Sequence, residues 1–204
     1  IMNAWIIIWL IFWAAGMGIP NYLFKKYKIT YYEKSWQHSL FFLVLTTLLF
    51  IPYKSQFGEY FASVSWEQIV FFLLLTIAWL VAPAFYQKDY YTKKERIGYQ
   101  IPKYYEVLFQ DICFLGGLLT FGISPGLFGF VFFLVHLPAV FLLPKRFALL
   151  PITGSLVGGL IIAYLQASGV SGFLFALFVH LSFWFFLHYF LVRNKLFGVL
   201  PVKR

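Results

Sequence analysis

YYEVLFQDICFLGGLLTF, the stretch from residue 104 to residue 121, has the length and apolar character of a membrane-spanning helix, yet it contains two carboxylates, Glu106 and Asp111. A helix that crosses a bilayer needs about 20 apolar residues, and about 17–25 is usual. A charged side chain at the centre of such a helix costs about 2.5–3.5 kcal/mol on insertion scales. Because Leu or Phe would avoid that cost, the two carboxylates indicate a site.

The composition of the whole chain is that of an integral membrane protein. Of its 204 residues, 62% are hydrophobic and 11% are charged, and the mean hydropathy is +0.81. A soluble domain averages about 45–50% apolar and about 25% charged residues. We therefore predict an all-α, polytopic membrane helix bundle, with a short second span and a sixth span broken by Pro151 and Gly154. The apolar stretches predict seven spans, roughly 3–19, 39–53, 66–86, 104–121, 127–143, 148–166 and 170–192.

The basic residues favour one orientation in the membrane. Of the 16 Lys and Arg residues, all except Lys54 fall in the first, third and fifth loops or in the C-terminal tail. The positive-inside rule therefore predicts an external N-terminus and a cytoplasmic C-terminus, and we expect a bacterial inner membrane. Bases interleaved with aromatic residues in these loops permit contact with anionic lipids, although an ordinary topology signal with an aromatic belt explains them as well. Because the net charge of +9 is distributed in this way, we expect no nucleic-acid partner.

The two carboxylates of the fourth stretch differ in depth. Glu106 follows Lys103 by three residues and shares a helix face with Gln110, one turn further on. The helix macrodipole favours a carboxylate in a first turn, so a purely structural role is one reading of Glu106. Asp111 is deeper and is harder to explain by structure alone, although it could face a loop or pair with a neighbour.

Two histidines lie within later apolar stretches, His136 in the fifth and His180 in the seventh. His180, Trp184 and His188 follow one another at steps of four residues, which places them on one face of a helix. A lone buried histidine is commonly satisfied by a carbonyl or hydroxyl group. Two histidines on different helices, with a carboxylate on a third, favour a shared site.

The order of these residues resembles the CAAX-protease and bacteriocin-processing (CPBP, or Abi) family of intramembrane proteases. That family has three motifs: Glu-Glu-x-x-x-Arg, Phe-x-x-x-His, and His-x-x-x-Asn or Asp. The corresponding segments here are Tyr105 to Gln110, Phe132 to His136, and His180 to Trp184. The resemblance covers roughly residues 100–192. It implies N-terminal transmembrane helices and basic loops over 1–99, and a CPBP-like helical core with a basic tail over 100–204.

Three positions depart from the family's pattern. Tyr105 replaces the first Glu, and a phenol with a pKa of about 10 is a poor base at neutral pH. Gln110 replaces the Arg, and Trp184 replaces the Asn or Asp. We therefore expect a pseudoenzyme that binds or stabilises a membrane partner or complex. The residues that would be catalytic if activity survived are Glu106, His136 and His180, with Tyr105, Gln110, Asp111 and Trp184 lining the site.

Two other functions stay open. In an active endopeptidase, Glu106 would be the general base, while His136 and His180 would position water or stabilise the oxyanion. In an accessory subunit or transporter, Glu106, Asp111 and the histidines would carry protons. Two His and a carboxylate also make a catalytic zinc set. The chain has no His-Glu-x-x-His helix, however, and we expect no metal or other cofactor.

Overall fold

The protein is a bundle of α-helices. The computed structural model describes residues 2–28, 33–85, 93–138 and 145–188, and all regular structure in these ranges is helical. The all-α fold class is thereby confirmed. The helices are α1 (Met2–Tyr27), α2 (Ser35–Leu49), α3 (Lys54–Phe61), α4 (Trp66–Phe85), α5 (Lys93–Phe121), α6 (Pro125–His136), α8 (Lys145–Ala167) and α9 (Val170–Phe185).

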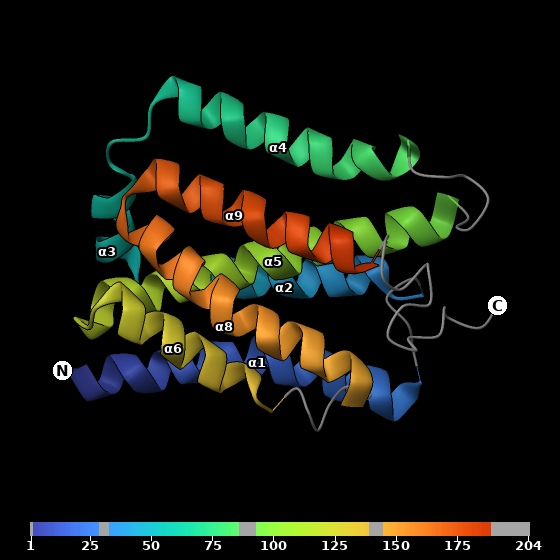
Figure 1. Ribbon diagram of the computed structural model, residues 1–204, viewed down its shortest axis with the longest axis horizontal. Helices are drawn as coiled ribbons and strands as arrows, with labels where there is room; N and C mark the ends of the chain where they lie inside the picture. The colour runs from blue at the N-terminus through green and yellow to red at the C-terminus, as the bar shows by residue number, and fades with distance from the viewer. Residues whose placement is uncertain (1, 29–32, 86–92, 139–144, 189–204) are drawn as a thin grey trace.

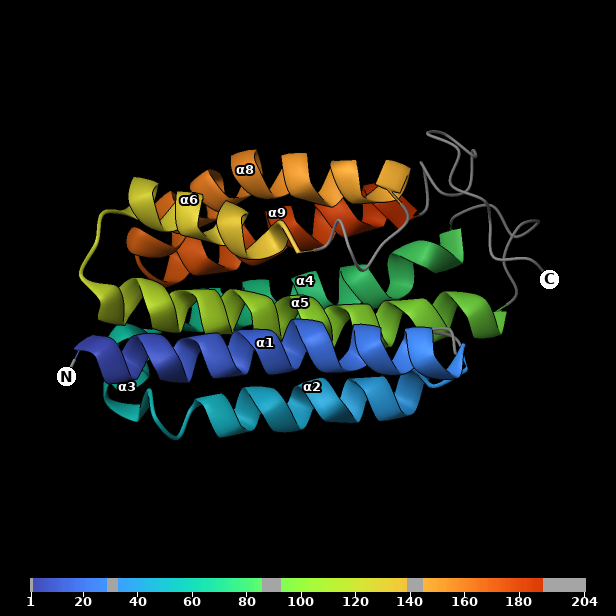
Figure 2. The ribbon, with the colours of Figure 1, turned by 90° about the horizontal axis from the view of Figure 1, so that it is seen from below.

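The long helices lie along one axis, and α5 is in the middle of them (Figures 1 and 2). Figure 2 shows α1 and α2 on one side of α5 and α6, α8 and α9 on the other. The sequence explains the central position of α5. This helix carries large apolar side chains on several faces, and a helix that is apolar all round is buried. Val107, Phe109, Phe114 and Leu115 are fully buried.

Aromatic side chains from both halves of the chain form one hydrophobic core. Trp9 of α1 is 1% exposed, and its indole nitrogen donates a hydrogen bond to the main-chain oxygen of Cys113, at 2.8 Å. Phe109 of α5 packs against Phe42 of α2, and Phe114 packs against Phe128 of α6. The predicted division at residue 99 stays a prediction, and this core extends across it.

The helices account for part of the predicted membrane topology. Among the described residues, two segments are long and apolar enough to cross a membrane, Ala4–Leu23 and Val170–His188. The pair α2 and α3 adds a third candidate if its 92° bend is counted within one span. Each of the seven predicted stretches overlaps a helix, but a bundle of seven spans is not confirmed by this criterion.

The predicted break in the sixth span is wrong, since α8 continues through Pro151 and Gly154. Neighbouring helices can satisfy the backbone groups that a Pro or Gly leaves unpaired in an apolar bundle. The helix in the fifth predicted span, α6, ends at His136, and Pro138 has no backbone N–H with which to extend it. Residues 139–143 of that span and 189–192 of the seventh lie outside the described residues.

Two glycines bring the backbones of α6 and α8 into close contact. A Cβ atom on Gly159 would lie 2.9 Å from the main-chain oxygen of Gly129 and 2.7 Å from the Phe132 ring. Such small-residue contacts let helices approach closely in a membrane. We expect Gly159→Ala to destabilise the protein by about 1–3 kcal/mol through overpacking.

The adjacent glycine gives a matched control for this prediction. A Cβ atom on Gly158 would have no heavy atom within 4 Å, so Gly158→Ala is expected to be neutral or slightly stabilising. The free energy of unfolding of both variants can be measured by titration with sodium dodecyl sulfate. Equal losses in the two variants would show that the α6–α8 contact is not tight.

Candidate functional site

Three side-chain pairs join α5 to α9 along the length of the bundle. On α5 the three residues are separated by multiples of four positions, and the partners on α9 and the turn after it are four residues apart, so each set forms one row on its helix. Because the helices are antiparallel, the two rows meet in reverse order (Figure 1). The pairs, which we call the α5–α9 seam, are Asp111 with His180, Lys103 with Trp184, and Tyr99 with His188.

The Asp111–His180 pair is the deepest of the three. Asp111 is 1% exposed, and its Oδ1 lies 3.0 Å from Nδ1 of His180. An ionised carboxylate only accepts hydrogen bonds, so we assign the proton to Nδ1 of the imidazole. The second carboxylate oxygen, Oδ2, is buried and has no hydrogen-bond partner among the described residues. Gln166 of α8 donates to the main-chain oxygen of Asp111 at 3.1 Å, which ties a third helix to this point.

Glu106 belongs to a different cluster, between α5 and α2. The Nζ atom of Lys103 lies 2.9 Å from Oε2, and Gln110 donates to Oε1 at 3.2 Å. The Nε2 atom of His38, on α2, lies 3.5 Å from Oε2. At about 100° per residue, Glu106 and Asp111 point about 140° apart on the helix. This angle explains why one carboxylate meets α2 and the other meets α9.

Lys103 connects the cluster to the seam. Its ammonium group binds Glu106 and also lies 4.0 Å from the centre of the Trp184 ring. A desolvated cation over an aromatic face is stabilised by about 2 kcal/mol. The stack of Tyr99 on His188 closes the seam, with ring centres 3.5 Å apart.

His136 is the last residue of α6 and is held by its own helix. Its Nδ1 lies 2.7 Å from the main-chain oxygen of Phe132, and a carbonyl oxygen can only accept, so Nδ1 carries the proton. The ring also makes an edge contact with Trp13 of α1, with centres 5.2 Å apart.

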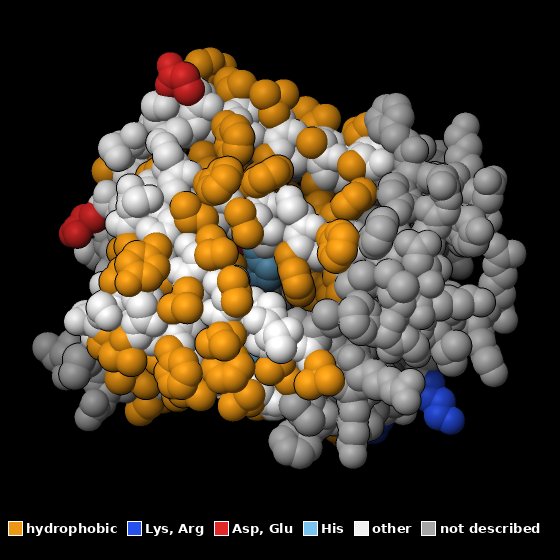
Figure 3. All heavy atoms as spheres, in the orientation of Figure 1, with side chains coloured by type: hydrophobic (Ala, Val, Ile, Leu, Met, Phe, Trp, Pro, Cys, Tyr) orange, Lys and Arg blue, Asp and Glu red, His pale blue; other side chains and the backbone are white. Residues whose placement is uncertain are grey.

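His136 and His180 line the same cavity, which has a volume of about 260 Å³ and lies between α6, α8 and α9. Figure 3 shows a hollow in the apolar face of the molecule with a histidine at its floor. The described residues that line the cavity include Trp184 and Ser155 but not Glu106. The remaining lining residues are Phe132, Gly154, Val157, Gly158, Ile161, Ile162, Val179 and Phe183.

The predicted site residues therefore fall into two groups. His136, His180 and Trp184 meet at the cavity, and Asp111 joins them through His180. Glu106 and Gln110 lie together in the cluster toward α2. Tyr105 is partly buried in the hydrophobic core.

Sequence reasoning missed Lys103 and His38 as partners of Glu106. The contact of Lys103 with Glu106 could have been predicted, since side chains at i and i+3 are neighbours on a helix. We had instead placed Lys103 in a loop. His38 comes from 68 positions away and carries no local signal of this contact. Among the described residues, no group of three or more His, Cys, Asp or Glu side chains is arranged to hold a metal ion.

Comparisons with known proteins found no matching family model, no matching curated protein and no matching solved structure. The likeness to CPBP proteases consequently rests on the three short motifs alone.

Proposed function

We propose that this chain is a seven-span membrane protein whose CPBP-like core binds a membrane partner or complex instead of cleaving a peptide bond. One observation carries the proposal: Glu106, the remaining motif carboxylate, is engaged by Lys103 and Gln110 and does not line the cavity. A general base must lie within about 2.6–3.2 Å of the proton that it removes, or reach it through one water. A carboxylate turned toward α2 is poorly placed to activate water beside the two histidines.

The residue at the third motif supports the same conclusion. Trp184 stands at the cavity where the family has Asn or Asp, and an indole can donate a hydrogen bond but cannot accept one. Its ring is covered by the ammonium group of Lys103. The position thus serves helix packing in this chain.

An active peptidase is the second candidate, and the Asp111–His180 pair favours it. A carboxylate that accepts from Nδ1–H orients the imidazole and leaves Nε2 as the basic nitrogen, as in hydrolases that use an Asp-His pair. In this version His180, rather than Glu106, would act as the base.

Two variants separate these candidates from glutamate-dependent cleavage. We expect Glu106→Gln to retain the stoichiometric membrane partners that co-purify with the wild type in mild detergent, and to leave the processing of membrane peptides unchanged. The double variant Asp111→Asn/His180→Phe tests the second candidate. The measurement is mass spectrometry of the purified complexes and of a membrane-peptide library. Loss of a cleavage product with Glu106→Gln would overturn the proposal, and loss with the double variant alone would favour the second candidate.

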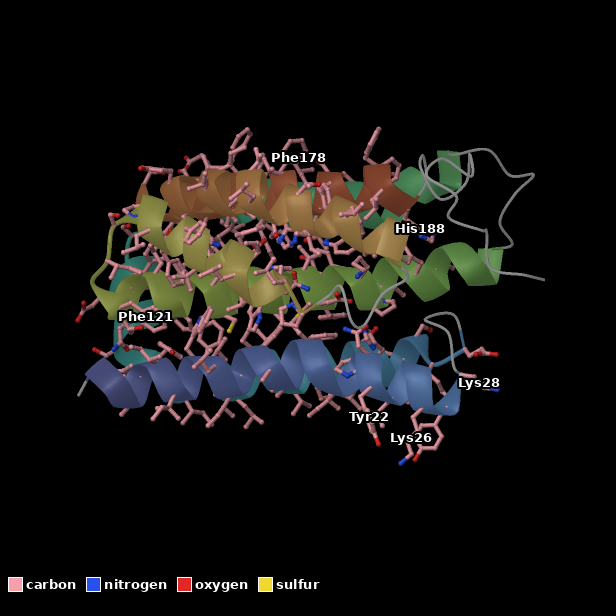
Figure 4. The ribbon with its side chains drawn as sticks, turned by 60° about the horizontal axis from the view of Figure 1, so that its bottom comes forward. Tyr22, Lys26, Lys28, Phe121, Phe178 and His188 are labelled. Carbon is pink, nitrogen blue, oxygen red and sulfur yellow. The ribbon has the colours of Figure 1, made fainter. Side chains whose placement is uncertain are left out.

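The proposed orientation places the N-terminus outside and the C-terminus in the cytoplasm of a bacterial inner membrane. It is supported by the helix ends: α1, α4 and α9 end, and α2, α5 and α8 begin, toward one end of the bundle, while α6 runs toward that end and stops part-way (Figures 1 and 2). Figure 4 shows Tyr22, Lys26 and Lys28 pointing away from the helices at that same end. Bases and aromatic residues are the expected side chains of a cytoplasmic interface.

Cysteine labelling tests this orientation. Lys34 directly precedes α2 and Lys54 begins α3, just beyond the other end of α2, and both are exposed, so each can be replaced by Cys in a Cys113→Ala background. With a membrane-impermeant maleimide added to intact spheroplasts, we expect Lys54→Cys to be labelled and Lys34→Cys to react only after permeabilisation. The reverse pattern would invert the topology, and labelling of both from outside would contradict an odd number of crossings between these sites.

A further inference from the structure

The cavity between α6, α8 and α9 offers unused hydrogen-bond acceptors. In His136 and His180 the Nδ1–H is used internally, by Phe132 and Asp111 respectively, so Nε2 of each neutral ring is a hydrogen-bond acceptor. Neither Nε2 atom has a hydrogen-bond partner in the part of the chain that the structure describes. His180 is 8% exposed and is therefore a buried acceptor at the cavity wall.

Trp184 contributes ring surface to the same wall. Its indole nitrogen is fully buried and does not face the cavity. A ligand that supplies a hydrogen-bond donor would therefore satisfy an acceptor that the cavity leaves unused.

The size and lining of the cavity limit the ligand. Its volume of about 260 Å³ exceeds the roughly 150 Å³ of an apolar cavity that holds benzene. It is too small for a transmembrane helix, whose diameter is about 10–12 Å. Most of the wall is apolar, and the hollow opens on an apolar face of the molecule (Figure 3). A cavity of this size and lining matches the polar end and first carbons of a single hydrocarbon chain.

We propose that this cavity binds a single-chain lipid alcohol whose hydroxyl group lies beside the two histidines. A hydroxyl donates one hydrogen bond, so it matches the Nε2 acceptor of a neutral imidazole. A charged head group would carry a larger desolvation cost at this depth. The chain would run outward past Gly158, which lines the cavity and lacks a side chain. This inference is independent of whether the protein binds a protein partner.

The test uses a photoreactive, alkyne-bearing long-chain alcohol and its methyl ether, with the protein reconstituted in nanodiscs. The ether has the same chain but cannot donate a hydrogen bond. We expect the alcohol to label peptides of α8 and α9 about tenfold more efficiently than the ether, as the loss of one hydrogen bond predicts.

A cavity-filling variant gives the matched control. Neither Gly158, on α8, nor Gly18, on α1, has a heavy atom within 4 Å of an added Cβ. We expect Gly158→Leu to abolish the labelling and Gly18→Leu to preserve it. Equal labelling by the alcohol and the ether in the wild type, unchanged labelling of Gly158→Leu, or stronger labelling by a fatty acid of equal chain length would each overturn the proposal.

Discussion

Lys103→Met is expected to destabilise the protein by about 3–5 kcal/mol, the cost of leaving a buried partner charge uncompensated. The Lys103 and Glu106 side chains are 5% and 9% exposed, and their charged atoms lie 2.9 Å apart. Met keeps most of the volume and the flexible apolar stem of Lys. The loss of stability in Lys103→Met therefore measures the effect of the unpaired charge and not that of a cavity.

Glu106→Gln is expected to cost less than Lys103→Met. A Gln side chain still accepts a hydrogen bond through its carbonyl oxygen, and the ammonium group of Lys103 keeps its contact with the Trp184 ring. The double variant Lys103→Met/Glu106→Gln should recover most of the loss, because removing both charges of a buried pair is often nearly neutral.

A double-mutant cycle measured by unfolding in sodium dodecyl sulfate gives the coupling energy. Lys54→Met supplies the control, since Lys54 is exposed at the start of α3. Additive effects of the Lys103 and Glu106 substitutions would show that the two side chains do not interact in the folded protein.

The sequence was sufficient to predict an all-helical chain. Apolar stretches interrupted by bases place a helix over each predicted span, although α6 ends at His136, before the predicted end of its span. The turn between α2 and α3 was harder to predict, because the apolar stretch 39–53 runs through it. Only the short length of that stretch set it apart from the other predicted spans. Pro151 shows the opposite error, since a Pro breaks a helix only where neighbours do not compensate for its missing N–H.

The site was predicted less well than the fold, for a geometric reason. The motifs order Glu106, His136 and His180 along the chain, but the angle around α5 decides which carboxylate reaches the histidines. That angle is fixed by helix geometry and was available from the sequence. The sequence did not show which neighbouring helix each face of α5 meets, because that depends on the packing of α2 and α9 around α5.

The second large effect is expected at the α5–α9 seam, where His180→Phe should destabilise the protein by about 3–5 kcal/mol. His180 Nδ1 is the hydrogen-bond partner of Asp111 Oδ1, and Oδ2 has none among the described residues. Phe fills the space of the imidazole but leaves the carboxylate without a donor. The cost is that of an unpaired buried charge.

Asp111→Asn separates charge from packing. Alone it should cost about 1 kcal/mol, because the amide oxygen still accepts from Nδ1–H of His180. Combined with His180→Phe, it should restore most of the stability, since a buried amide is far cheaper to leave unpaired than a carboxylate.

His136→Phe is the matched control for His180→Phe. The chemical change is the same, but Nδ1 of His136 donates to the carbonyl of Phe132 within its own helix and not to a carboxylate. We therefore expect a loss of about 1 kcal/mol, measured by the same titration. If the two His→Phe variants lost equal stability, Asp111 would not carry a charge that depends on His180, and the pair could not serve as the oriented base of the second candidate function.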